Sequence, residues 1–229
     1  MASDQQNITR RAIIGLAQFI VVLGLMFFLP AWTVDYWQAW LYLFVFTTMT
    51  TFTTVYFLRR DPKLVERRLQ PGPIAEKQSR QKTIQWFTSA CLILLFVVSS
   101  LDHRFGWSHV GARVAILANV FLVAGFAVMF LVLRENSYAS SIVEVGEGQS
   151  VVSTGPYRFV RHPMYAGGLL MIFCTPIALG SLWGLLPAIG MFVAIVVRLL
   201  DEERFLSQHL RGYDDYRTQT RARLFPFIW

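Results

Sequence analysis

The side chains best suited to chemistry gather in residues 154–168, at the entrance of a long apolar run. This stretch holds two arginines, one histidine and two tyrosines among prolines and glycines. Polar side chains beside a membrane segment are costly and usually functional. Pro163 suits the first turn of a helix, so Arg161 and His162 are expected at a helix entrance. Free N–H groups and a partial positive charge at that entrance favour an anionic group.

A second polar group follows about forty residues later, where Arg198 and Glu202 are four residues apart and share one helix face. The uncharged run 163–197 between the two groups contains 35 residues. As one helix it would be about 50 Å long, more than the roughly 30 Å hydrocarbon core of a bilayer. Helix-breaking residues near its middle predict a hairpin instead; they are Pro176, Gly180, Ser181, Gly184 and Pro187.

Such a hairpin would place Arg198 and Glu202 beside Arg161 and His162 in one pocket at the inner membrane interface. Cations and donors would lie on one side and a carboxylate on the other, which suits a zwitterionic cofactor together with a lipid-borne acid. The residues alone leave a second interpretation open. The arginines could reach for lipid headgroups, His162 could cap the helix, and Glu202 could pair with Arg198.

The whole composition indicates the scaffold that positions this pocket. The chain is 55% hydrophobic and 15% charged, whereas about 25% of residues are charged in an average soluble domain. Four uncharged blocks are long enough to span a bilayer, namely residues 12–34, 36–58, 83–101 and 114–133. We therefore predict an all-α, polytopic membrane protein, with four spanning helices and a C-terminal hairpin that make five to six membrane helices.

The basic residues predict the orientation in the membrane. With the N-terminus inside, 19 of the 21 Lys and Arg residues lie on the inner side, and only Arg104 and Arg113 lie outside. Both termini and the polar loops 59–82 and 134–161 are then cytoplasmic. This bias and anionic lipid account for the net charge of +7, so nucleic acid is not expected as a partner. The basic loop 59–82 is expected on the lipid surface, with direct substrate binding as the alternative.

The sequence divides into a spanning region, residues 1–133, and a candidate catalytic region, residues 134–229. Within the second, residues 144–148 (Glu-Val-Gly-Glu-Gly) look like a dinucleotide fingerprint but lack the strand and helix that it needs, so a loop turn is predicted. Cys91 and Cys174 lie inside apolar segments, and His209 has no partners with a ligand spacing. No metal site is predicted.

Residues 151–167 carry a family resemblance, which continues after the hairpin at Arg198, Glu202, Glu203, Leu206, Tyr213, Tyr216 and Pro226. The pattern resembles the isoprenylcysteine carboxyl methyltransferase family and its phospholipid methyltransferase relatives. It covers roughly the last 80 residues, and the first four helices match in hydropathy only. The Arg-His-Pro-x-Tyr core with a Glu-Glu pair about forty residues later is its specific part.

The resemblance implies an integral-membrane methyltransferase that uses S-adenosylmethionine, releases S-adenosylhomocysteine and has no soluble nucleotide-binding domain. It implies that Arg198 acts on the substrate, and Arg161 is the second candidate catalytic residue. The implied cofactor-binding residues are Gln149, Ser150, Val151, Val152, Tyr157, His162, Pro163, Met164, Tyr165 and Glu202.

The expected reaction is carboxyl methylation of an isoprenylcysteine-like or other lipophilic acid that enters from the bilayer, in a bacterial inner membrane or an endoplasmic-reticulum-type membrane. Arg198 would orient the acid and Glu202 would hold the cofactor's ammonium group. Membrane lipids are the other expected partners, and the oligomeric state is left open. Three alternatives remain: methylation of a phospholipid amine, an NADPH-dependent reductase of the sterol type, and a lipid-binding protein without catalysis.

Overall fold

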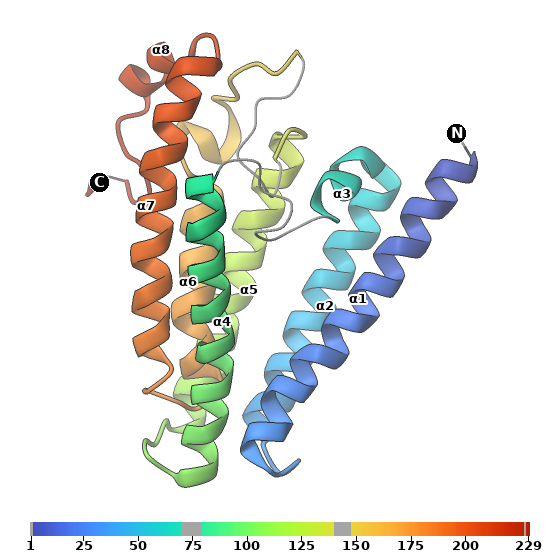
Figure 1. The fold of residues 1–229 in the computed structure, drawn as a ribbon, viewed down its shortest axis with the longest axis vertical. Helices are drawn as coiled ribbons and strands as arrows, with labels where there is room; N and C mark the ends of the chain where they lie inside the picture. The colour runs from blue at the N-terminus through green and yellow to red at the C-terminus, as the bar shows by residue number, and fades with distance from the viewer. Residues whose placement is uncertain (1, 70–78, 140–147, 227) are drawn as a thin grey trace.

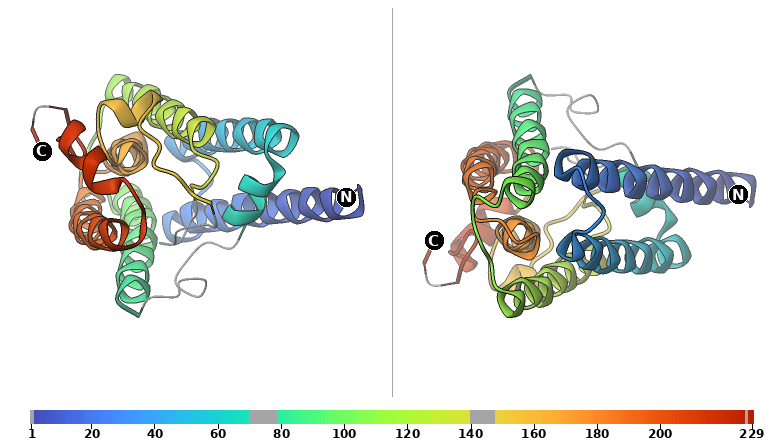
Figure 2. Two further views of the ribbon diagram at one scale, coloured as in Figure 1. Left: turned by 90° about the horizontal axis from the view of Figure 1, so that it is seen from above. Right: turned by 90° about the horizontal axis from the view of Figure 1, so that it is seen from below.

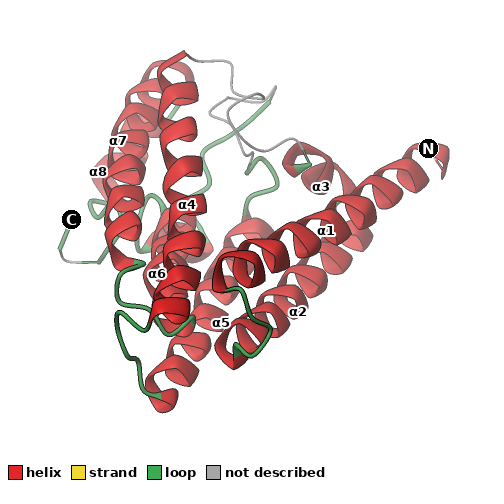
Figure 3. Cartoon of the chain, turned by 60° about the horizontal axis from the view of Figure 1, so that its bottom comes forward, coloured by secondary structure: helices red, strands yellow, loops and turns green. Residues whose placement is uncertain are grey.

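The computed structural model consists of α-helices joined by loops, and it describes residues 2–69, 79–139, 148–226 and 228–229 (Figures 1 and 3). None of these residues forms a strand, so the predicted all-α class is confirmed. A short 3₁₀ helix, η1 (Gly155–Arg158), precedes α6. The α-helices are α1 (Ala2–Ala31), α2 (Trp37–Arg60), α3 (Pro62–Arg68), α4 (Ser79–Phe105), α5 (Ala112–Glu135), α6 (Pro163–Ala178), α7 (Leu185–His209) and α8 (Tyr213–Gln219).

The four predicted spans are confirmed by length and composition as α1, α2, α4 and α5. The most apolar 18-residue windows of these helices have mean hydropathies from 1.4 to 2.7. Large apolar side chains on them point outward, as at Phe44, which is 70% exposed, and Val21, which is 61% exposed. An exposed apolar surface of this kind suits a helix that faces lipid.

The predicted hairpin is also present, as α6 and α7. At 16 residues α6 is about 24 Å long, whereas α7 has 25 residues and continues past the apolar run to His209. The bend between them is held by hydrogen bonds to Tyr36, which directly precedes α2, and to Asp102 of α4. The Tyr36 hydroxyl donates to the Leu179 carbonyl at 2.6 Å, and Ser181 Oγ donates to Asp102 at 2.6 Å. Gly180 has a φ of +80°, which favours glycine.

The hairpin packs closely on the helix before it, because glycines face each other across α5 and α6. A Cβ added at Gly125 would lie 2.5 Å from Met171 Cγ and 3.0 Å from the Gly167 carbonyl oxygen. A larger residue at Gly125 would therefore push α6 away from α5. Since α6 begins at Pro163, this packing sets the position of the polar stretch that precedes it.

Helices α4 to α7 form one bundle, and α1 and α2 form a pair that leans away from it (Figures 1 and 2). α4 packs mainly against α7 and α1, and α5 mainly against α6. The loops α1–α2 and α4–α5 and the α6–α7 bend lie at the lower end in Figure 1, whereas α3, η1 and α8 lie at the upper end. The membrane face to which this upper end belongs stays a prediction. The predicted loop turn at residues 144–147 and the Pro71-Gly72-Pro73 segment of the basic loop lie outside the described residues.

Candidate active site

A cavity of about 450 Å³ lies at the end of the bundle that carries α3, η1 and α8. Its wall is built by the start of α6, the second half of α7, α8 and the loop before η1, with α3 and α4 on other sides. All twelve residues that the sequence singled out line it: Gln149, Ser150, Val151, Val152, Tyr157, Arg161, His162, Pro163, Met164, Tyr165, Arg198 and Glu202. The hairpin thus brings the two polar groups together, while the role of each residue stays a prediction.

A tyrosine joins the arginine and the glutamate that share one face of α7. The Tyr165 hydroxyl, from the first turn of α6, donates to Glu202 Oε2 at 2.5 Å. Arg198 Nε donates to the same hydroxyl at 3.0 Å. These two bonds fix the guanidinium and the carboxylate relative to each other on the cavity wall. The site therefore presents a cation and an anion in a set arrangement.

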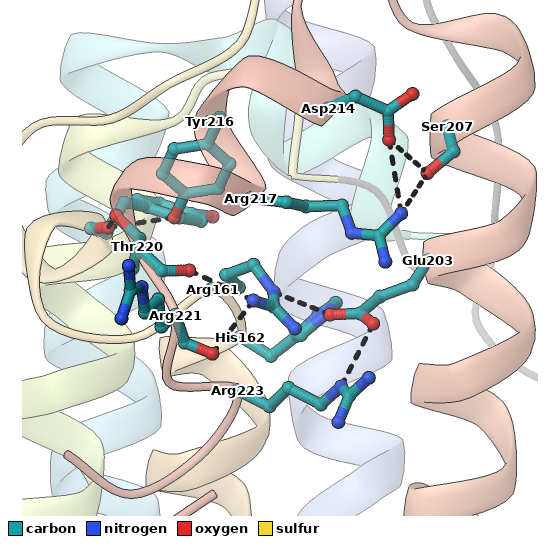
Figure 4. Close-up of polar contacts among 11 residues, drawn as sticks. Arg161, His162, Glu203, Ser207, Asp214, Tyr216, Arg217, Thr220, Arg221 and Arg223 are labelled. Carbon is teal, nitrogen blue, oxygen red and sulfur yellow. Dashed lines mark hydrogen bonds and ion pairs between the residues drawn. The ribbon is translucent and has the colours of Figure 1, made fainter. Parts of the chain in front are cut away.

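The neighbouring glutamate, Glu203, points into a different environment. It is buried and accepts hydrogen bonds from Arg161 Nε at 2.7 Å, His162 Nε2 at 3.3 Å and Arg223 Nε at 3.0 Å. Figure 4 shows these side chains converging on its two oxygens. Burial alone raises the pKa of Glu203, but the hydrogen bonds from His162, Arg161 and Arg223 outweigh burial and lower this pKa to about 2. Glu203 is therefore ionised at neutral pH.

The chain after α8 is fastened to the same cluster. Arg161 Nη1 donates to the carbonyl oxygens of Thr220, at 3.0 Å, and Arg221, at 2.9 Å (Figure 4). The backbone N–H groups of Arg161 and His162 donate to the carbonyls of residues 222 and 223, both at 2.9 Å. The Arg161 guanidinium thus uses Nε for Glu203 and Nη1 for two backbone carbonyls of the chain after α8. This arrangement favours a positioning role, and catalysis by Arg161 stays a prediction.

His162 occupies the N-cap position of α6, but its side chain makes no capping hydrogen bond. Its Nε2 lies beside Glu203, and its ring is stacked on Tyr165 with the ring centres 5.7 Å apart. Because the ionised Glu203 only accepts, His162 Nε2 carries a proton and donates it to this carboxylate, and Nδ1 is the second ring nitrogen. Among the described residues no hydrogen bond involves Nδ1, and His162 lines the cavity. Nδ1 is therefore the ring nitrogen with which His162 can form a hydrogen bond to a ligand.

Several residues of the cavity were not assigned from the sequence. α8 contributes Tyr213 and Tyr216, which had entered only as part of the resemblance. The Tyr213 hydroxyl is buried and has no hydrogen-bond partner within the described residues. The Tyr216 hydroxyl donates to the Tyr157 carbonyl at 2.8 Å, and the Tyr157 hydroxyl accepts from Asn136 at 3.0 Å. Burial is the main cause that raises the pKa of Tyr157 to about 12.

A second part of the cavity lining is apolar and comes from three helices, with Leu92 from α4, Ile172 from α6, and Met191 and Ile195 from α7. α4 also contributes the polar residues Gln85, Thr88 and Ser89, one and two turns before Leu92. Hydropathy could not predict which apolar side chains line the cavity, because a spanning helix carries apolar side chains on all of its sides. The cavity is amphipathic, and it suits a ligand with a polar end and an apolar end.

α3 contributes one residue, Arg68, which lies in the region for which the sequence left substrate binding open. Its Nη1 is 3.8 Å from Met164 Sδ. Burial lowers the pKa of Arg68, and the nearby Tyr157 acts in the opposite direction. Among the described residues that line the cavity, Arg68, Arg161 and Arg198 are the arginines and Glu202 is the carboxylate, while Glu203 pairs with Arg161 outside the lining.

Comparisons with known proteins agree with the resemblance in the sequence. Residues 113–212 match the profile of the phospholipid methyltransferase family. A methanethiol S-methyltransferase of Crocosphaera subtropica is 31% identical over 72 residues, which are 31% of this chain and 28% of that protein. The match thus spans less than a third of that relative's length. The family match includes all of α6 and α7, together with the residues just before α6, and therefore His162, Arg198 and Glu202.

Proposed function

We propose that this chain, which is related to the phospholipid methyltransferase family over residues 113–212, is an integral-membrane enzyme that methylates a lipophilic acid with S-adenosylmethionine. The observation that carries the proposal is the amphipathic cavity, which is lined by all twelve residues of the predicted site. The surrounding scaffold contains four helices that are long and apolar enough to cross a membrane, which supports an acceptor that enters from the bilayer. The comparisons support methyl transfer, and the acceptor is argued from the side chains of the cavity.

The side chains fit S-adenosylmethionine, which carries an ammonium group, a carboxylate and an adenine ring. Glu202 offers a carboxylate for the ammonium group, and the Arg and Gln side chains of the wall offer donors for the carboxylate. The buried Tyr213 hydroxyl has no partner among the described residues and fits a polar atom of a ligand. The volume of about 450 Å³ lies within the usual range of ligand pockets, about 300 to 1,000 Å³. When bound, the cofactor supplies an already activated methyl group.

The role of the protein in this reaction is mainly to position and to exclude water. A carboxylate is ionised at neutral pH, because its ordinary pKa is about 4, so no general base is needed. Arg198 orients the acid, and Tyr165 keeps Arg198 at a set distance from Glu202. Correct orientation alone lowers a barrier by about 7–11 kcal/mol in favourable cases. The apolar wall removes water from the nucleophile.

Isothermal titration of detergent-purified protein with S-adenosylhomocysteine tests the cofactor. Glu202→Ala should weaken binding by about tenfold or more, since a charged hydrogen bond contributes about 1.5–3 kcal/mol, and His162→Ala should also weaken binding because the His162 ring lines the cavity. Asp215→Ala, an exposed acid on α8, is the matched control and should bind as the wild type. If folded wild-type protein bound NADPH and not S-adenosylhomocysteine, the reductase alternative would replace this proposal. Binding of neither would leave the lipid-binding alternative.

A second candidate is methylation of an amine or a thiol, and the orientation of His162 favours it. Its Nδ1 can accept a proton while Glu203 stabilises the imidazolium that results. The family match and the thiol-methylating relative point to acceptors of these kinds. Such an acceptor must lose a proton, so its methylation should rise with pH, whereas methylation of a carboxylate should stay flat above about pH 6. The pH profile of methyl transfer into a membrane lipid extract separates the two.

A further inference from the structure

Arg68 lies where a basic surface helix meets the cavity. α3 carries Lys63, Arg67 and Arg68, and it follows directly on Arg59 and Arg60 at the end of α2. Its start is fixed by Asp61, which accepts from the Leu64 backbone N–H at 3.1 Å. A basic segment of this kind at a membrane surface attracts anionic lipid headgroups.

The position of α3 is set by packing and not by its charges. Leu64 is 1% exposed and packs with Phe57 of α2 and Leu133 of α5. This contact turns the last turn of α3 toward the cavity, so that Arg68 lies in its wall while Lys63 is exposed. Arg68 is thus the residue by which the basic surface reaches the site.

The Arg68 guanidinium differs from the other cations of this region in its partners. Arg161 and Arg223 both pair with Glu203, at 2.7 Å and 3.0 Å. The described contact of Arg68 is with the sulfur of Met164, at 3.8 Å, and no carboxylate of the described residues lies within ion-pair distance of it. A partly desolvated guanidinium loses hydration, and among the described residues no carboxylate compensates Arg68 for this loss. An anionic group of a ligand would supply the missing partner.

We propose, in an inference that rests on the proposed function, that Arg68 binds the anionic headgroup of the methyl acceptor, a phosphate or carboxylate of a membrane amphiphile. Arg68 on α3 and Arg198 on α7 line the same cavity, so both guanidinium groups would bind the acceptor's headgroup. The acceptor's chain would occupy the apolar part of the cavity. A guanidinium suits this role because its planar donors match carboxylate and phosphate oxygens in pairs. The basic surface of α3 would guide such an amphiphile to the cavity.

The test is isothermal titration of detergent-purified wild-type protein, Arg68→Gln and the matched control Lys63→Gln with three probes. Dihexanoylphosphatidic acid and decanoate carry the anionic groups, and dihexanoylglycerol has the chains without a charge. The wild type and Lys63→Gln should bind the anionic probes at least about tenfold more tightly than the neutral probe. Arg68→Gln should lose this preference and keep its affinity for the neutral probe.

S-adenosylhomocysteine serves as the fourth titrant and separates this inference from the proposed function. Unchanged anion preference in Arg68→Gln, or none in the wild type, overturns the role of Arg68 even if the cofactor product binds. Weaker S-adenosylhomocysteine binding with unchanged lipid binding also overturns it, because Arg68 would then bind the cofactor's carboxylate. Arg68-dependent lipid binding without S-adenosylhomocysteine binding supports the anion site and removes the proposed function.

Discussion

Glu202 and Glu203 are neighbours in the sequence, and their surroundings are opposite. Glu203 is 4% exposed and accepts from three cationic or imidazole donors, all of which belong to the protein. Glu202 lines the cavity, and its described hydrogen bond comes from the Tyr165 hydroxyl. Adjacent residues of an α-helix point about 100° apart, so one position faces the tail and the other faces the cavity. The comparison separates a carboxylate that holds the fold from one that is available to a ligand.

The largest expected effect follows from removing the buried member of the pair. Glu203→Ala leaves Arg161 and Arg223 without their carboxylate, and breaking a buried ion pair in this way costs about 3–5 kcal/mol. We expect a large fall in melting temperature and in the yield of folded protein from detergent. Glu202→Ala, measured in parallel, should melt close to the wild type. Equal melting temperatures of Glu203→Ala and Glu202→Ala would contradict the view that Glu203, and not Glu202, stabilises the fold.

In the cavity that Glu202 lines, Arg198→Ala should lower turnover while cofactor binding is kept. The change removes the cation that orients the acceptor, and loss of one such group typically lowers turnover by about 10²–10³. Transfer of radiolabel from S-adenosylmethionine into a membrane lipid extract measures turnover, and titration with S-adenosylhomocysteine measures binding. Arg204→Ala, an exposed arginine on the same helix, is the control. Lost cofactor binding with intact turnover per bound cofactor would assign Arg198 to the cofactor.

The pH dependence of stability tests the cluster around Glu203. Its pKa is lowered from an ordinary 4.5 to about 2 in the folded protein, so the unfolded chain takes up its proton first as pH falls. The stability that Glu203 contributes is therefore complete above about pH 4.5 and is lost as pH falls toward 2. Glu203→Gln should lack this part of the pH dependence. Identical slopes of melting temperature against pH in the two proteins, from pH 5 to 3, would contradict the assignment.

The sequence predicted the features that depend on local pattern. Hydropathy predicted the four spans, and Pro176 and Gly180 predicted the bend that brings Arg198 beside His162. The resemblance named Glu202 as a site residue, but it left Glu203 without a role. Short periodic patterns carry this information because each depends on residues that are close in the chain.

The remaining features depend on partners far apart in the chain, which no local pattern specifies. Arg161 and Glu203 are separated by 42 positions, and the backbone of His162 pairs with that of Arg223. Arg68 reaches the cavity because Leu64 packs between α2 and α5, which is a property of the folded bundle. In the sequence nothing distinguished Arg68 from the other Lys and Arg residues of the basic loop 59–82.

The smallest expected effect comes from the hydroxyl that connects the open glutamate to its arginine. Tyr165→Phe removes both hydrogen bonds of that hydroxyl but keeps the ring stacked on His162. Hydrogen bonds to charged groups contribute about 1.5–3 kcal/mol each, but this hydroxyl orients Glu202 and Arg198 and is not itself assigned to the cofactor, so S-adenosylhomocysteine binding should weaken by only about fivefold. Stability should change little, because water in the cavity can replace the lost hydroxyl at Glu202. The control Tyr56→Phe, on α2 outside the cavity, should change neither S-adenosylhomocysteine affinity nor stability. If Tyr165→Phe lost more stability than Glu203→Gln, the hydrogen bonds of Tyr165, and not the cluster around Glu203, would hold this end of the bundle together.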